Sequence, residues 1–159
     1  MLALIREHND AQSVIDIFNK LDDVLGTETF KKLFVIILTV NGSEFSNPTA
    51  IEVNPNTGEV RTQIFYCDPG RSDQKGSGEV NHEMIRRVLP KGTSFDNLNQ
   101  EDINKLMSHI NSYKRKKLND QSPYDLFSLM YGQDIANKLG IYKINPNDIN
   151  LKEDLLKKD

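Results

Sequence analysis

The sequence predicts an α/β protein with a helical C-terminal half. A continuous apolar run, Leu33–Leu38, lacks the alternation of a half-buried strand, which is typical of a strand covered on both faces in an α/β sheet. A second β-rich segment occupies residues 62–67, and helical spacing dominates after residue 79. The 159 residues leave room for one domain of this class.

The first predicted element is a helix over residues 9–25. Asn9 with Gln12 three residues later resembles a capping box, and Gly26 suits the position just after a helix. One face is apolar, because hydrophobic residues recur at helical spacing. They are Ala11, Val14, Ile15, Phe18, Leu21 and Leu25.

Two strands are predicted next, over residues 32–39 and 62–67. Asn41-Gly42 is a turn signal that ends the first, and Asp68-Pro69-Gly70 ends the second. A short helical turn and a loop are expected between them. The polar, glycine-punctuated stretch 70–77 predicts a mobile loop.

The rest of the chain is predicted to be helical. Helices are expected over 79–89 and 99–117, the second with an apolar stripe that includes Ile103 and Ile110. A third begins at Ser122-Pro123, where serine suits the N-cap and proline the first helical position, and it breaks near Gly132. The remaining tail after Gly140, which contains Pro146, is expected to fray.

Composition narrows the class of protein. Hydrophobic residues make up 37% and charged residues 27%, a polar balance that still suits a folded chain. One cysteine, Cys67, excludes a disulfide framework and a cysteine-rich zinc module. No apolar run is long enough to span a bilayer, and the first ten residues lack the apolar core of a signal peptide. We therefore expect a soluble, cytoplasmic protein with no membrane partner.

Charge is unevenly distributed along the chain. Residues 1–80 carry a net charge of -5, residues 81–117 carry +4 and residues 118–159 carry -2. A basic segment inside an acidic chain indicates a polyanionic partner. The alternative, a solvated helix face with ordinary lysine and arginine residues, remains open.

Three stretches carry a resemblance to a known family. LTVNGSEFSNP (38–48), IFYCDPG (64–70) and QKGSGEVNHEMIRRVLPKGTSFDNL (74–98) resemble insertion-sequence transposases, and more narrowly the insertion-sequence-thirty family. Residues 103–127 look like the segment that follows the catalytic core in that family. The resemblance implies an incomplete ribonuclease-H-like (retroviral integrase-like) core over 1–120, truncated at its N-terminal side, and a helical C-terminal segment over 121–159.

The chemistry implied by the resemblance is metal-dependent DNA cleavage and strand transfer. Such enzymes hold two Mg²⁺ or Mn²⁺ ions with two Asp and one Glu, because hard cations prefer oxygen ligands. Glu79 matches the third carboxylate and is the predicted catalytic and metal-binding residue. Val40 stands where the second carboxylate is expected, and the first would precede the helix at 9–25. We therefore expect no activity from this chain alone, with Glu44 as an alternative ligand near Val40.

The implied partner is DNA, and three descriptions of the present function remain open. The first is a catalytic-core fragment related to DNA transposition and integration. The second is a non-enzymatic DNA-binding module, or one that pairs with an intact transposase or with itself and acts as an inhibitor. The third is a decayed remnant without a role. The predicted DNA-binding residues are Lys75, Arg86, Arg87, Lys91, Lys114, Arg115, Lys116 and Lys117.

Overall fold

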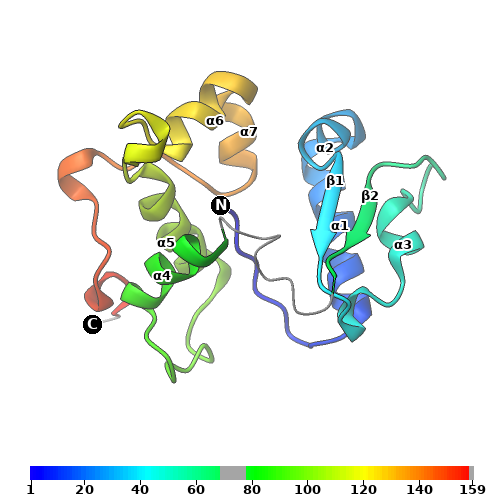
Figure 1. The fold of residues 1–159 in the computed structure, drawn as a ribbon, viewed down its shortest axis with the longest axis horizontal. Coiled ribbons are helices and arrows are strands. Elements are labelled where there is room, and N and C mark those ends of the chain that lie inside the picture. Colours follow the sequence, from blue (N-terminus) through cyan, green and yellow to red (C-terminus); the bar gives the residue numbers. More distant parts are fainter. Residues whose placement is uncertain (69–77, 158–159) are drawn as a thin grey trace. The chain divides into compact units, whose positions relative to one another are not determined.

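The computed structural model describes residues 1–68 and 78–157, except for the side chains of residues 78–81 (Figure 1). The chain divides into two compact units. The sheet unit is Arg6–Gly76, and the helical unit is Met1–Ile5 together with Ser77–Asp159. The division at residue 120, which follows from the family resemblance, stays a prediction about the catalytic core.

The sheet unit combines helices with a two-stranded parallel sheet. Its helices and strands are α1 (Ala11–Leu25), α2 (Thr27–Leu33), β1 (Ile36–Thr39), α3 (Pro48–Glu52) and β2 (Gln63–Tyr66). A single 3-10 turn, Ser43–Phe45, follows β1. A mixed α/β architecture and both predicted strands are therefore confirmed.

Two details at the helix boundaries of the sheet unit were predicted wrongly. The N-cap of α1 is Asp10 and not Asn9, because the Asp10 carboxylate accepts the Ser13 backbone N–H at 2.8 Å. The predicted strand over 32–39 begins only at Ile36, since Thr27–Leu33 forms α2. Phe30 fixes that helix: it is fully buried and packs edge-on against Phe18.

The sheet is covered on one face only, which corrects the expectation of a doubly buried strand. Ile37 and its register partner Ile64 pack against Val14, Ile15 and Ile51. On the other face, Leu38 and its partner Phe65 are 47% and 50% exposed. The described residues supply no second layer there, so the uninterrupted apolar run is half buried and half open.

A buried arginine connects the elements of the sheet unit. The Arg61 guanidinium is fully buried and forms an ion pair with Asp22 at 2.8 Å. It also donates to the Ile51 carbonyl at 2.8 Å and to Asn19 Oδ1 at 2.7 Å, and it lies 5.3 Å from the centroid of the Phe30 ring. These contacts join α1, α2 and α3 through one side chain.

The helical unit contains α4 (Gly78–Val88), α5 (Gln100–Ser112), α6 (Pro123–Tyr131) and α7 (Gln133–Lys138). The start of α6 is confirmed: Ser122 accepts the Asp125 backbone N–H and Pro123 is the first helical residue. Asn99 and Asp102 form a reciprocal capping box at the start of α5. The predicted break at Gly132 is also confirmed, because φ there is 93°.

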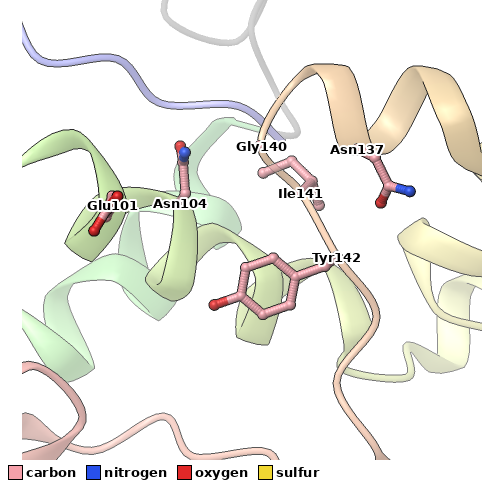
Figure 2. A pocket seen from close by; sticks show the side chains of 6 residues that line it. All are labelled: Glu101, Asn104, Asn137, Gly140, Ile141 and Tyr142. Atoms are coloured by element: carbon pink, nitrogen blue, oxygen red, sulfur yellow. The ribbon is translucent and has the colours of Figure 1, made fainter.

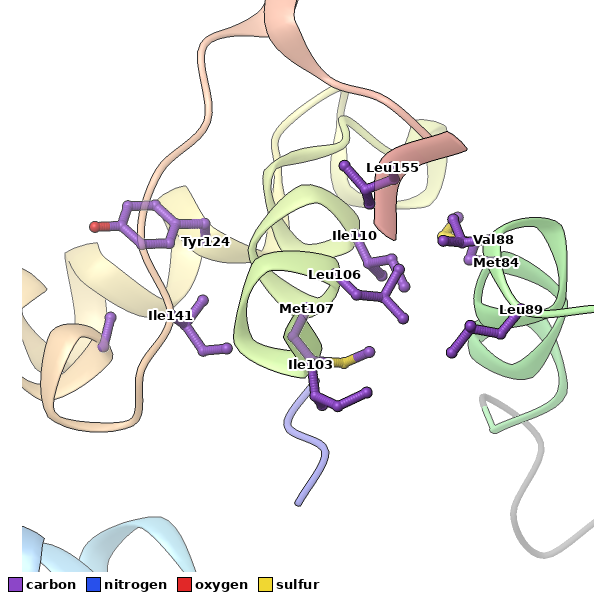
Figure 3. Packing of buried hydrophobic residues seen from close by; sticks show 11 residues of the cluster. Met84, Val88, Leu89, Ile103, Leu106, Met107, Ile110, Tyr124, Ile141 and Leu155 are labelled. Carbon is purple, nitrogen blue, oxygen red and sulfur yellow. The ribbon is translucent and has the colours of Figure 1, made fainter. Parts of the chain in front are cut away.

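Helix α5 is the centre of the helical core. Leu106, Met107 and Ile110 are almost fully buried among residues of α4, α6 and the C-terminal tail (Figure 3). The tail does not fray before residue 157, which corrects the prediction. Leu155 is buried in this core, and its carbonyl accepts from Lys105 Nζ at 3.0 Å. Within residues 1–68 and 78–157, none of the helices has the length and hydrophobicity needed to cross a bilayer.

Candidate nucleic-acid interface

One group of predicted DNA-binding residues lies at the end of α4. Met84 and Val88 bury the apolar face of that helix in the core, so Arg86 and Arg87 fall on its solvent side and are exposed. Lys91, shortly after the helix, is exposed as well. The structure therefore presents all three cations to solvent, as a phosphate-binding role requires.

A second group, which we call the basic turn (Lys114–Lys117), follows α5. The predicted helix over 99–117 is too long, because α5 ends at Ser112 and Tyr113 is extended, with ψ at 124°. A tight turn replaces the last helical turns. It is closed by hydrogen bonds from Arg115 N to the Gln121 carbonyl at 3.1 Å and from Asp120 N to the Arg115 carbonyl at 3.2 Å.

The basic turn displays three lysines and holds one arginine. Lys114, Lys116 and Lys117 are exposed, whereas Arg115 is partly buried. Burial lowers the pKa of the Arg115 guanidinium. Burial, and to a lesser extent the charge of Arg115, lowers the pKa of the Met1 α-amino group. Arg115 thus belongs to the body of the helical unit, and the lysines form its charged surface.

The two groups together contain six exposed cations, and none of the six forms an ion pair with another described residue. They are Arg86, Arg87, Lys91, Lys114, Lys116 and Lys117. Leu89, at the end of α4, and Ile103, near the start of α5, face each other in the core (Figure 3). The α4 group and the basic turn therefore lie toward opposite ends of α5. A helix of 13 residues is about 20 Å long.

Two predicted site residues, Glu79 and Lys75, lie partly or wholly outside the described part of the structure. Glu79 is the second residue of α4, and its side chain lies outside the described part. Lys75 lies outside the described residues altogether. The assigned roles of both residues stay predictions.

The C-terminal end of β1 is the place that the resemblance assigns to the second carboxylate. Val40 follows β1 directly, and its hydrocarbon side chain is exposed. The Cys67 backbone N–H donates to the Thr39 carbonyl at 2.7 Å, which places the residues after β2 beside this end of the sheet. Glu44 folds back onto Gly42, since a methyl group on Gly42 would lie 2.5 Å from Glu44 Oε2. Among the described side chains, no group of three or more His, Cys, Asp or Glu residues could hold a metal ion.

A polar pocket in the helical unit was not predicted. It has a volume of about 380 Å³ and is lined by Glu101, Asn104, Asn137, Gly140, Ile141 and Tyr142 (Figure 2). The glycine after α7 is the only local signal for it. The pocket depends on a long-range approach of Gly140 to Asn104, which the sequence does not reveal.

Parts of this chain are similar to bacterial transposases. The transposase for insertion sequence element IS1086 of Cupriavidus metallidurans is 32% identical over 66 residues, which are 42% of this chain and 20% of that protein. The transposase for IS4351 of Bacteroides fragilis is 26% identical over 103 residues, 65% of this chain and 30% of that protein. The chain is a relative of the insertion-sequence transposases.

The more specific resemblance is supported as well. The transposase InsI for insertion sequence element IS30A of Escherichia coli is 26% identical over 76 residues, 48% of this chain and 19% of that protein. The matched segments thus span less than a third of each of these three transposases. No family model matches the chain, and no solved structure matches it.

Proposed function

We propose that this chain acts in DNA transposition as a DNA-binding relative of the insertion-sequence transposases. The observation that carries the proposal is the set of six exposed cations that form no ion pair with any described residue, in a chain related to transposases. Unpaired surface cations neutralise phosphates without first breaking an existing ion pair.

The sheet unit is proposed to correspond to part of a ribonuclease-H-like core. Two features support this: β1 and β2 are parallel neighbours, and the turn Asn41–Phe45 follows the C-terminal end of β1. Ends of parallel strands are where α/β proteins place their functional groups. Under this proposal, Glu79 is the one carboxylate retained from a catalytic set.

The residues present do not fit a two-metal site. Val40 cannot ligate a cation, whereas Mg²⁺ and Mn²⁺ require oxygen ligands from several side chains. Loss of one member of a cooperating set already removes most of the activity of an enzyme. The proposed function is therefore binding without strand transfer, and no catalytic step is derived for the chain.

DNA binding is tested by fluorescence anisotropy with a labelled 20-base-pair duplex at 50 mM salt. Changing Lys114, Lys116 and Lys117 to Gln is expected to weaken binding at least ten-fold, because three phosphate contacts are lost. A matched control changes the exposed Lys20, Lys32 and Lys152 to Gln and thus removes the same charge elsewhere. Equal losses in both variants would show only a response to net charge and would contradict the proposed interface.

The absence of catalysis is tested with a strand-transfer assay on insertion-sequence ends in Mg²⁺ and in Mn²⁺. The expected result is no joined product with either ion. Product that disappears in Glu79→Gln would show a working metal site and would overturn this part of the proposal. The same Glu79→Gln variant is expected to keep its duplex affinity.

The open face of the sheet favours pairing with an intact transposase as a second candidate function. Leu38 and Phe65 form an apolar surface on a sheet whose described residues contain only two strands. Exposed apolar patches and strand edges are common sites of association. Co-elution with the IS30A transposase in gel filtration, lost on changing Leu38 and Phe65 to Lys, is the expected result. Failure to co-elute would leave DNA binding as the sole candidate.

A further inference from the structure

The polar pocket of the helical unit is held open by a close backbone approach. Gly140 adopts a φ of 73°, and a methyl group on it would lie 2.3 Å from Asn104 Nδ2. No larger residue would leave room for the Asn104 amide in this position. Asn104 Oδ1 accepts from Gln100 Nε2 at 2.9 Å, which fixes the orientation of the amide.

The opposite wall is anchored as well. Ile141 is buried in the core, and the Tyr142 backbone N–H donates to Ser108 Oγ at 3.1 Å. The Tyr142 ring nevertheless remains 44% exposed beside the pocket, across from Glu101 and Asn104 (Figure 2). One aromatic residue of the pocket is thus accessible for stacking.

The lining determines the class of ligand. The Glu101 carboxylate accepts hydrogen bonds and repels a phosphate, whereas the amides of Asn104 and Asn137 can each accept or donate. A flat, uncharged group that carries an amine donor satisfies both the acceptors and the tyrosine ring. A volume of about 380 Å³ lies at the lower end of the range of ligand pockets, about 300–1,000 Å³.

We infer that this pocket binds an unpaired DNA base that carries an exocyclic amine, namely adenine, cytosine or guanine, an inference that rests on the proposed DNA binding. The base stacks on Tyr142, and its exocyclic amine donates to the Glu101 carboxylate. Thymine fits less well, because it has no exocyclic amine and its single N3–H donor lies between two carbonyl oxygens that the carboxylate repels. A base inside a regular duplex is stacked and paired, so the pocket distinguishes distorted or single-stranded DNA from intact duplex.

The test compares three labelled DNAs by anisotropy: a perfect duplex, and the same duplex with one unpaired adenine or one unpaired thymine. Wild-type protein is expected to bind the unpaired-adenine DNA at least five-fold more tightly than the perfect duplex, with a smaller gain for thymine. Tyr142→Leu is expected to lose the preference for the unpaired base. The control Tyr113→Leu, which changes a tyrosine of similar exposure outside the pocket, is expected to keep it.

The role of Glu101 has its own variant. Glu101 is exposed, so Glu101→Gln leaves the core intact. The glutamine amide can donate to a thymine carbonyl or accept from an adenine amine, so this variant is expected to bind both unpaired-base DNAs equally. A retained preference for adenine would overturn the assignment of Glu101 as the acceptor.

Two failures are distinguishable. If the protein binds all three DNAs with equal affinity, the pocket inference is overturned while the proposed DNA binding stands. If no DNA binds, the proposed function fails, and a titration with deoxyadenosine, which carries no phosphate, followed by NMR decides the pocket. Shifts of the Gly140 and Tyr142 amides would sustain the inference, and unchanged amides would overturn it.

Discussion

The buried Arg61–Asp22 pair allows a quantitative test of how the sheet unit is held together. Arg61→Met replaces the guanidinium by an apolar chain of similar length and leaves Asp22 charged at 2% exposure. The variant also loses the hydrogen bonds to the Ile51 carbonyl and to Asn19. The perturbation thus removes the cationic partner of the buried Asp22 carboxylate, together with two further hydrogen bonds, in a unit whose apolar core is otherwise unchanged.

The expected loss in the free energy of unfolding is about 3–5 kcal/mol, the cost of breaking a buried ion pair by removing one partner. The free energy of unfolding of a typical domain is about 5–15 kcal/mol, so this loss is a large share of it. The double variant Arg61→Met/Asp22→Asn should recover most of it, because replacing both charges is often close to neutral. Asn54 Nδ2 donates to Asp22 Oδ2 at 2.7 Å. In the double variant this hydrogen bond can persist, because Asp22→Asn keeps one side-chain carbonyl oxygen as an acceptor.

Native-state hydrogen exchange gives the most specific assay. In Arg61→Met, amides of α1 should lose protection, whereas amides of α5, which belongs to the other unit, should keep it. Urea denaturation followed by circular dichroism measures the free-energy change itself. A single variant within about 1 kcal/mol of wild type, or a double variant no more stable than the single, would refute the reasoning.

Two further predictions concern the helical unit. Burial, and then the charge of Lys105, lowers the pKa of His109 below 6.5, and neutral His109 Nδ1 accepts the Asn150 backbone N–H at 3.0 Å. The unfolded chain therefore binds the proton more readily, so the free energy of unfolding should fall as the pH drops below about 6.5. His109→Gln should flatten this dependence in denaturation between pH 5 and pH 8, and an unchanged slope would contradict it. Leu106→Ala should lower the free energy of unfolding by about 2–5 kcal/mol, because Leu106 is fully buried. Leu129 is 82% exposed, so Leu129→Ala should change that free energy by no more than about 0.5 kcal/mol. Similar losses for both variants would argue against the assigned core.

Local signals in the sequence predicted the start of α6 correctly. Ser122 and Pro123 begin α6 as predicted, because capping and the fixed φ of proline act within a few residues. Strand existence was also predictable, since β-branched runs flanked by turns are strong signals. The start of β1 was not predictable from such signals, because Lys32 and Leu33 belong to α2. That helix is stabilised by the long-range packing of Phe30.

The candidate site was only partly predictable for the same reason. The basic residues could be named from charge alone, but α5 stops at Ser112, and Asn119 and Asp120 adopt positive φ in the turn that follows. The pocket requires Gly140 to meet Asn104 across the helical unit. Such tertiary approaches leave no periodic pattern in a single sequence.

The central claim, phosphate binding by the exposed cations, is tested most directly by the salt dependence of duplex binding. Six phosphate contacts predict a slope of about -5 for the logarithm of the association constant against the logarithm of salt concentration. Changing Lys114, Lys116 and Lys117 to Gln should reduce the size of that slope by about 2.7, while the control at Lys20, Lys32 and Lys152 leaves it unchanged. A wild-type slope near zero, or equal slopes in wild type and the basic-turn variant, would contradict the account.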